Sequence, residues 1–330
     1  MKPLTRVVSI CAACILLLAT GCGSSSNSPV PGPSFTLYVV QNENLSSMVG
    51  NSVLEFPANV SGSIAATNSV TVPMQTTYDA VAVDTAGNLY VSASVTTFPA
   101  LYEILVYAAG ATGSATPART ITSSSFSTFI SSIAVDSTGE VYALSGNSIS
   151  VFAANAAANA TPVRQIAGNL TQLNSASAIA VDAAQNIYVA NTQANDILVF
   201  SSTETGNASP AGVLTGTATE ISSPSGVAVD SSGDIYVASY NQPSNSSLVL
   251  EFAPAATGNA TPSKMLTAIA ADTLGGLAVD ALDNLYVYTT ASGQLAIAVY
   301  SSGETGSNIP VKTISSTAWT KSTYGQIAVR

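Results

Sequence analysis

Five aspartates recur along the chain at spacings of 46 to 52 residues. Carboxylates in such numbers could bind a divalent metal or transfer protons. Each one follows an apolar-Ala-Val triplet and opens a linker of the type Asp-x-x-Gly-Asn, as in VAVDTAGNLYV from position 81. In such a linker the carboxylate accepts hydrogen bonds from nearby backbone N–H groups, and glycine or asparagine tolerates positive φ. We therefore interpret them as structural residues of hairpin turns: Asp84, Asp136, Asp182, Asp230 and Asp280.

The sequence contains no histidine and three cysteines, Cys11, Cys14 and Cys22. Without histidine the chain cannot form a Ser-His-Asp triad or a histidine-liganded zinc site. The cysteines all precede the repeats, so none is expected to act as a nucleophile in the domain. A divalent-metal site made of carboxylates and amides stays open. The sequence assigns no catalytic residue, metal ligand or cofactor, and it leaves enzyme activity undecided, with the weight against it.

A second set of residues breaks the repeat, in connections that we expect on the face opposite the aspartate turns. The set is Asp196, Tyr240, Asn241, Asp272, Tyr288 and Trp319, and a Ser-rich connection adds Phe98, Phe126 and Phe129. An aromatic and amide rim of this kind suits a sugar or a peptide. The alternative is that these loops are solvated, with their aromatics packed locally and Asp196 capping the turn at Asn195.

These residues must be positioned by a repeat with a period near 49 residues. Each unit predicts four short strands, and three of them carry a recurring residue. The first has a central alanine, small enough for strands that converge on a common axis: Ala82, Ala134, Ala180, Ala228, Ala278 and Ala328. The second carries Tyr38, Tyr90, Tyr142, Tyr188, Tyr236 and Tyr286. The third ends in a ring that fills the wider outer wedge: Phe56, Tyr107, Phe152, Phe200, Phe252 and Tyr300.

Six such units account for residues 35–330, provided that one unit is divided between the chain ends. Its first strand is IAVR at 327–330, and its remainder begins with LYVV at 37. We predict an all-β, six-bladed β-propeller whose ring is closed by the C-terminal strand joining the N-terminal blade. The expected blades are 35–78 plus 324–330, 79–130, 131–176, 177–224, 225–274 and 275–323.

The fourth strand carries a cation two residues after a recurring proline, namely Arg119, Arg164, Lys264 and Lys312. One interpretation is a ring of cations that meets an anionic surface. The other is that outermost strands are sheet edges, where proline and positive charge block pairing with other chains.

Charged residues make up only 8% of the chain, against about 25% in a typical soluble domain. The formal net charge is −10. Because phosphate binding requires clustered lysine and arginine, we expect no nucleic-acid partner, and we expect a monomer.

The N-terminus is typical of an export signal, with Lys2 and Arg6 before an apolar run too short to span a bilayer. The run ends in Ala19-Thr20-Gly21-Cys22, which resembles a bacterial lipobox, although Ala19 stands where leucine is usual. The resemblance implies that residues 1–21 are removed, that Cys22 is acylated, and that 22–34 is a Ser/Pro/Gly tether. The protein would then be anchored in the bacterial envelope, with the outer membrane favoured. Without acylation it would be secreted.

The segment SPSGVAVD at 223–230, followed by SSGDIYVAS and LVLEF, resembles the NHL repeat. The resemblance covers nearly the whole domain and implies a propeller of a kind that includes ligand-binding modules, lyases and lactonases. The aspartate that often follows the tyrosine by three residues in that family is replaced here by Gln41, Ala93, Ser145, Asn191, Ser239 and Thr289.

These features favour a lipid-anchored, non-catalytic module that binds a glycan, a peptide or a protein. One alternative is a metal-dependent hydrolase or lyase of the lactonase type. Another is a surface-coat or adhesion protein, in which the Ser/Thr-rich faces would matter more than a pocket.

Overall fold

The computed structural model divides the chain into two compact units, Met1–Pro33 and Ser34–Arg330. It describes residues 35–41, 52–71, 76–77, 80–95, 99–241, 246–266, 273–291, 294–302, 309–317, 319 and 325–330. The predictions about the signal, Cys22 and the tether therefore concern residues outside the described part of the chain. Within the described part, no helix is long and apolar enough to cross a membrane.

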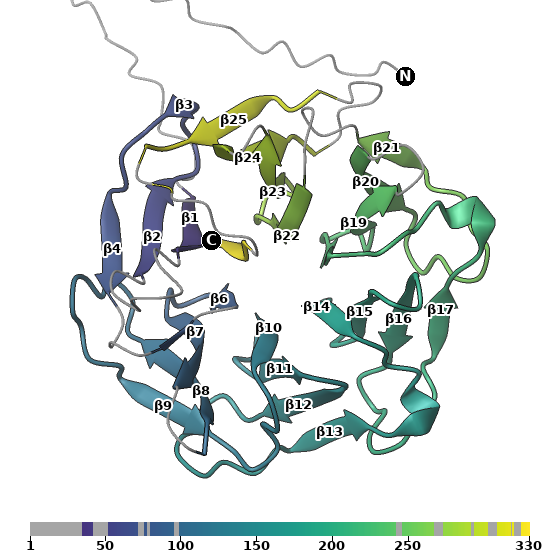
Figure 1. Ribbon diagram of the computed structural model, residues 1–330, viewed down its shortest axis with the longest axis horizontal. Coiled ribbons are helices and arrows are strands. Elements are labelled where there is room, and N and C mark those ends of the chain that lie inside the picture. The colour runs from purple at the N-terminus through teal and green to yellow at the C-terminus, as the bar shows by residue number, and fades with distance from the viewer. Residues whose placement is uncertain are drawn as a thin grey trace, which may run out of the picture. The chain divides into compact units, whose positions relative to one another are not determined.

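Six antiparallel sheets form a ring of blades around a central axis (Figure 1). Blade 1 contains β26 (Ile327–Val329), β1 (Thr36–Gln41), β2 (Ser52–Pro57) and β4 (Asn68–Thr71). Blade 2 contains β6 (Val81–Val83), β7 (Leu89–Val95), β8 (Leu101–Tyr107) and β9 (Arg119–Thr122), with β5 (Thr76–Thr77) also paired to β7. Blade 3 contains β10 (Ile130–Val135), β11 (Val141–Ser145), β12 (Ser148–Phe152) and β13 (Arg164–Ala167).

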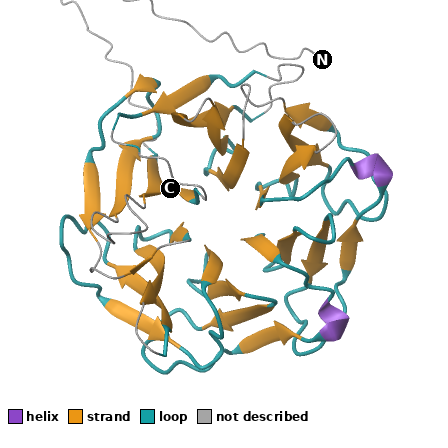
Figure 2. Cartoon of the chain, viewed as in Figure 1, coloured by secondary structure: helices purple, strands orange, loops and turns teal. Residues whose placement is uncertain are grey.

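The second half of the ring repeats this order, and strands dominate all six blades (Figure 2). Blade 4 contains β14 (Ala176–Val181), β15 (Ile187–Asn191), β16 (Asp196–Phe200) and β17 (Gly212–Leu214). Blade 5 contains β18 (Gly226–Val229), β19 (Ile235–Asn241), β20 (Ser246–Phe252) and β21 (Lys264–Leu266). Blade 6 contains β22 (Thr273–Val279), β23 (Leu285–Ala291), β24 (Gln294–Tyr300) and β25 (Lys312–Ser315). Two single-turn 3₁₀ helices, η1 (Asn169–Thr171) and η2 (Thr217–Thr219), follow β13 and β17.

The predicted architecture is confirmed: the protein is an all-β, six-bladed propeller. In every blade the central alanine of the first strand lies opposite the tyrosine of the second, as Ala82 lies opposite Tyr90. The third-strand rings are buried, with exposures of 0% for five of them and 6% for Tyr300. The core thus lies between neighbouring blades, where packing of these rings excludes water.

The two chain ends close the ring in blade 1. Strand β26 pairs with β1 in antiparallel register, with Ala328 opposite Tyr38. The pairing extends beyond the strands through Thr36 N–H to Arg330 O at 2.7 Å and Arg330 N–H to Thr36 O at 3.0 Å. The innermost strand of blade 1 comes from the C-terminus, and its other three strands come from the N-terminal part of the domain. The ring therefore cannot open at blade 1 without breaking the hydrogen bonds between β26 and β1.

Four outermost strands, β4, β13, β17 and β25, are not the open edges that the sequence suggested. Their ends pair in parallel with the connection that follows the third strand of the next blade. In blade 1, Thr71 N–H donates to Gly113 O at 2.7 Å, and Gly113 N–H donates to Ser69 O at 2.8 Å. Blades 3 and 4 make the same pair of bonds through Gly206 and Gly258, and β25 pairs with β3 (Gly62–Ser63). These glycines have positive φ, which a side chain would disfavour.

Candidate functional site

The five repeat aspartates stabilise the turns between the first and second strands. In blade 3 the Asp136 Oδ1 atom accepts from the backbone N–H of Thr138 at 2.9 Å and of Glu140 at 3.0 Å. The Oδ2 atom accepts from the Tyr142 hydroxyl at 3.1 Å. All five blades with this aspartate have the tyrosine contact, at 3.0 to 3.2 Å. The carboxylates are therefore used within the turns, as a structural role requires.

The hydrogen bonds in these turns also set the direction of the pKa shifts of two aspartates, Asp84 and Asp136. Burial by itself would raise the pKa of Asp84 and Asp136, but the hydrogen bonds they accept outweigh it and lower the pKa below the usual value. The tyrosines shift in the other direction: burial, reinforced by the Asp182 carboxylate, raises the pKa of Tyr188 to about 12. In blade 3 the lowered pKa of Asp136 and the raised pKa of Tyr142 make this pair a carboxylate acceptor and a hydroxyl donor at neutral pH.

Asp196 lies inside a small polar cluster at the opposite face of blade 4. It is 8% exposed, and its Oδ1 accepts from Asn191 Nδ2 at 2.8 Å. The fully buried Asn191 also accepts from Asn174 N–H at 2.6 Å and donates to Gln172 O at 3.1 Å. Burial raises the pKa of Asp196. The pair ties the hairpin between β15 and β16 to the preceding connection, so this carboxylate has little surface to offer a ligand.

Tyr288 and Trp319 lie in the packing between blades 6 and 1, whereas the sequence suggested a rim. Tyr288 is 2% exposed, and burial raises the pKa of its hydroxyl to about 12. Trp319 meets the ring of Phe56 edge to face, with centroids 5.0 Å apart. Phe126 packs on Phe152 between blades 2 and 3 in a tilted arrangement, with centroids 5.3 Å apart.

Trp319 therefore fills the space between two neighbouring blades, as Phe126 does. Phe126 and Trp319 both stand seven positions after the fourth-strand cation, at Arg119 and Lys312. Alignment on the cation would have revealed this equivalence from the sequence alone.

The other candidates fall in different places. Tyr240 is partly exposed near the end of β19, and its N–H donates to Ser222 O at 2.9 Å. Phe129 is half exposed, while Phe126 is buried. The side chain of Asn241, together with Asp272 and Phe98, lies outside the described residues. Of the four candidates whose side chains the structure describes, Tyr288 and Trp319 lie between blades 6 and 1, Asp196 lies in blade 4 and Tyr240 lies in blade 5.

The fourth-strand arginines join neighbouring blades, so they are neither edge charges nor an exposed cation ring. Arg119 donates to Ala156 O of blade 3 at 2.6 Å and to the Tyr90 hydroxyl at 2.9 Å. Arg164 donates to Ser201 O of blade 4 at 3.0 Å. Each guanidinium also lies over a second-strand tyrosine ring, 5.5 Å from the centroid of Tyr90 for Arg119 and 5.9 Å from that of Tyr142 for Arg164.

Blade 5 departs from this arrangement. Its cation is Lys264, whose Nζ lies 3.0 Å from Glu251 Oε1 and 3.1 Å from Oε2 within the same blade. Glu251 is 7% exposed. Valine occupies the equivalent position in blades 2, 3, 4 and 6, at Val106, Val151, Val199 and Val299. The buried carboxylate pairs with the lysine within its own blade, whereas the arginines donate to the next blade.

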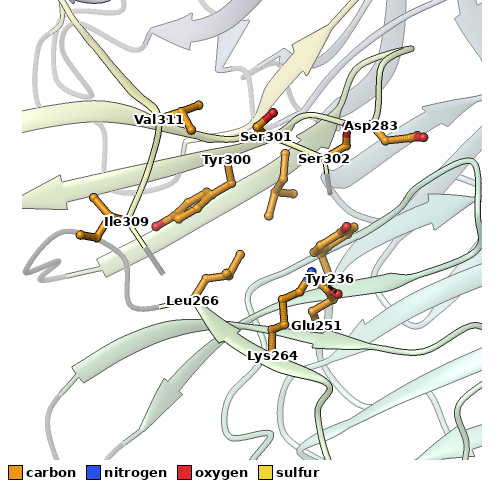
Figure 3. A pocket seen from close by; sticks show the side chains of 11 residues that line it. Tyr236, Glu251, Lys264, Leu266, Asp283, Tyr300, Ser301, Ser302, Ile309 and Val311 are labelled. Carbon is orange, nitrogen blue, oxygen red and sulfur yellow. Dashed lines mark hydrogen bonds and ion pairs between the residues drawn. The ribbon is translucent and has the colours of Figure 1, made fainter. Parts of the chain in front are cut away.

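A small pocket lies between blades 5 and 6 at this position, with a volume of about 30 Å³. Figure 3 shows Lys264 and Glu251 on one side of it and Tyr300 on the other. Its lining is Tyr236, Glu251, Lys264, Leu266, Asp283, Leu285, Tyr300, Ser301, Ser302, Ile309 and Val311. Ligand pockets for drug-sized molecules measure about 300 to 1,000 Å³, so this one suits a single small group.

Sequence reasoning missed this pocket, because it grouped Lys264 with Arg119 and Arg164 as equivalent cations. The sequence does distinguish blade 5, because in its third strand Glu251 replaces the valine of blades 2, 3, 4 and 6. Among the described residues, no cluster of three or more histidine, cysteine, aspartate or glutamate side chains is placed to hold a metal ion.

Comparisons with known proteins support the propeller fold and show nothing about function. No family model and no curated protein sequence matches the chain. A protein of unknown function from Bacteroides caccae is 9% identical with a TM-score of 0.60, over 90% of this chain and 99% of the other. A proposed 6-phosphogluconolactonase from Bacteroides uniformis is 16% identical with a TM-score of 0.55, over 85% and 82%. A Lactobacillus plantarum protein is 15% identical with a TM-score of 0.57, over 86% and 82%. The chain thus shares a propeller fold with proteins of different descriptions.

Proposed function

We propose that the protein is a lipid-anchored propeller of the bacterial envelope that binds a ligand or a partner without catalysing a reaction. The observation that carries the proposal is the pocket between blades 5 and 6, where the repeat is broken by an ion pair between the buried Glu251 and the partly exposed Lys264. The repeated carboxylates and arginines hold turns and blades together, so they are already committed to structure. A recess whose lining departs from the repeat is the place where a ligand is expected to bind.

Anchoring by Cys22 is the part of this proposal that a single substitution tests. Metabolic labelling with radioactive palmitate should mark the wild-type protein, and Cys22→Ser should abolish the label, because the thiol is the acylated group. Cys14→Ser is the matched control and should keep most of the label. Equal labelling of wild type and Cys22→Ser would refute acylation at this residue.

Binding is tested by a thermal-shift screen of the full chain, with divalent metals first, then glycans and short peptides. A ligand at 100 times its Kd stabilises the folded state by about 2.7 kcal/mol. If the loop face of blade 5 contributes, Tyr240→Ala should weaken binding of a glycan or peptide hit about tenfold, while Phe129→Ala should leave it unchanged. A hit that survives Tyr240→Ala would place recognition elsewhere on the ring.

The lactonase alternative is favoured by the likeness to the proposed 6-phosphogluconolactonase, which extends to the fold only. It requires carboxylate and amide ligands for a divalent cation. Incubation of the full chain with Mg²⁺, Ca²⁺ or Mn²⁺ and a panel of sugar lactones should give no hydrolysis above the uncatalysed rate. Metal-dependent turnover that chelation removes would replace the binding module by an enzyme.

A further inference from the structure

The pocket between blades 5 and 6 occupies the place that a guanidinium fills elsewhere in the ring. In blades 2 and 3 the fourth-strand arginine lies over the second-strand tyrosine and donates to the first part of the connection in the next blade. In blade 5 the tyrosine is Tyr236, and the corresponding residue of blade 6 is Ser301, which aligns with Ser201. Both line the pocket, together with Lys264.

We propose that this pocket binds a guanidinium group, presented by an arginine side chain of a partner or by a free arginine-like compound. The proposal rests on the binding role proposed above and names the ligand chemistry. Two arginine side chains of this molecule already lie over a second-strand tyrosine ring and donate to a backbone carbonyl in the connection of the next blade, which supports a guanidinium site of this kind.

The charge around the pocket favours a cation. Glu251 and Asp283 line it beside a single lysine, and Asp234 lies near enough to be affected by both carboxylates. Burial first, and then the neighbouring Asp230 and Glu251, raise the pKa of Asp234; Lys264 lowers it by less than either of these two carboxylates raises it, and Asp283 adds a smaller increase. One ammonium group therefore does not neutralise the local carboxylates, and an incoming cation would be attracted.

The chemistry selects guanidinium over ammonium. A guanidinium is planar, so it can stack on the Tyr236 ring while its N–H groups point to several acceptors in one plane. The Tyr236 hydroxyl donates to Asp230 Oδ2 at 3.0 Å, so its oxygen can accept, as the Tyr90 oxygen accepts from Arg119. The Ser301 carbonyl and Glu251 offer further acceptors. An ammonium group can satisfy fewer of these at once.

Calorimetric titration of the purified full chain tests the proposal with two pairs of probes. L-arginine methyl ester and L-lysine methyl ester represent a free compound, and acetyl-Gly-Arg-Gly-amide and acetyl-Gly-Lys-Gly-amide represent a partner chain. Probes are kept below about 20 mM, far under the molar range in which guanidinium unfolds proteins. We expect saturable 1:1 binding of the arginine probes with a Kd on the order of 1 mM, and at least tenfold weaker binding of the lysine probes. Tighter binding of the peptide than of the ester would assign the site to a partner chain, and the reverse would assign it to a small molecule.

Two variants connect the binding to the pocket. Lys264→Arg supplies the guanidinium from within, keeps the charge beside Glu251, and should abolish probe binding while leaving the melting temperature equal or higher. Tyr236→Phe removes an acceptor and should weaken binding several-fold. Tyr188→Phe in blade 4 is its matched control, because the Thr257 side chain already lies against Gly212 at the cation position of that blade, and it should leave probe binding unchanged.

Several outcomes would overturn the proposal. They are the absence of saturable binding by any arginine probe, equal affinity for arginine and lysine probes, and unchanged binding by folded Lys264→Arg. If arginine probes fail but the screen yields a ligand whose affinity depends on Tyr240, the binding module stands and only the guanidinium assignment falls.

Discussion

Deletion of residues 327–330 should destabilise the whole ring and lower the melting temperature by about 10 °C or more. The deletion removes β26, with the buried Ile327 and Ala328 and the backbone hydrogen bonds that β26 and Arg330 make to β1. Burial of an aliphatic side chain contributes roughly 1.5 to 3 kcal/mol, and each hydrogen bond about 1 kcal/mol. The loss is thus of the order of 5 kcal/mol, a large part of a typical folding free energy of about 5 to 15 kcal/mol.

A circular permutant is the control for this deletion. It begins at residue 325 and joins residue 330 to 35 by a short turn, which the contacts between Thr36 and Arg330 permit. Blade 1 then forms from one continuous segment with the same strands. The permutant should melt within a few degrees of the wild type in a calorimetric scan. A deletion variant that melts like the wild type would show that closure by β26 contributes little.

Substitution of Asp136 by alanine should destabilise the protein by about 2 to 4 kcal/mol. Asp136 accepts from the Thr138 and Glu140 backbone, from the hydroxyl of the fully buried Tyr142, and from Gln185 Nε2 at 2.8 Å in blade 4. Alanine would leave these donors without their acceptor. A melting temperature lower by roughly 5 to 10 °C is expected, whereas Ser137→Ala in the same turn, at an exposed position, should change it little.

The pH dependence of this difference gives an independent test. The pKa of Asp136 in the folded state lies below its usual value. The carboxylate therefore contributes its full stabilisation at any pH above the usual, unfolded-state pKa, and this contribution is lost as the pH falls through the folded-state pKa. The gap in unfolding free energy between wild type and Asp136→Ala should therefore be constant near neutral pH and should narrow below about pH 4. A gap that widens in acid would mean that the carboxylate does not act through these bonds.

The sequence predicted the ring because its features are local and repeated. A small residue at Ala82 and a tyrosine at Tyr90 recur with a period that only a closed array of similar blades explains, and both residues lie where the period put them. The division of blade 1 between the chain ends followed from the position of the last Ala-Val pair. Repetition carries this information because each blade must solve the same packing problem.

Contacts between blades could not be read in the same way. Whether Arg119 lies free on an edge or crosses to Ala156 depends on how the next connection folds back over the strand, which no local pattern specifies. The burial of two loop candidates could not be read from the sequence for a related reason. Tyr288 and Trp319 look like departures along the sequence, but the space between blades 6 and 1 encloses them.

The claim that recognition lies where the repeat is broken can be measured directly by hydrogen–deuterium exchange of the full chain, with and without saturating acetyl-Gly-Arg-Gly-amide. Slower exchange is predicted in β20, in β21 and at Ser301 and Ser302, with no change at the aspartate turns of blades 2 to 4. Protection spread evenly around the ring, or no protection anywhere at a concentration that saturates binding, would contradict it.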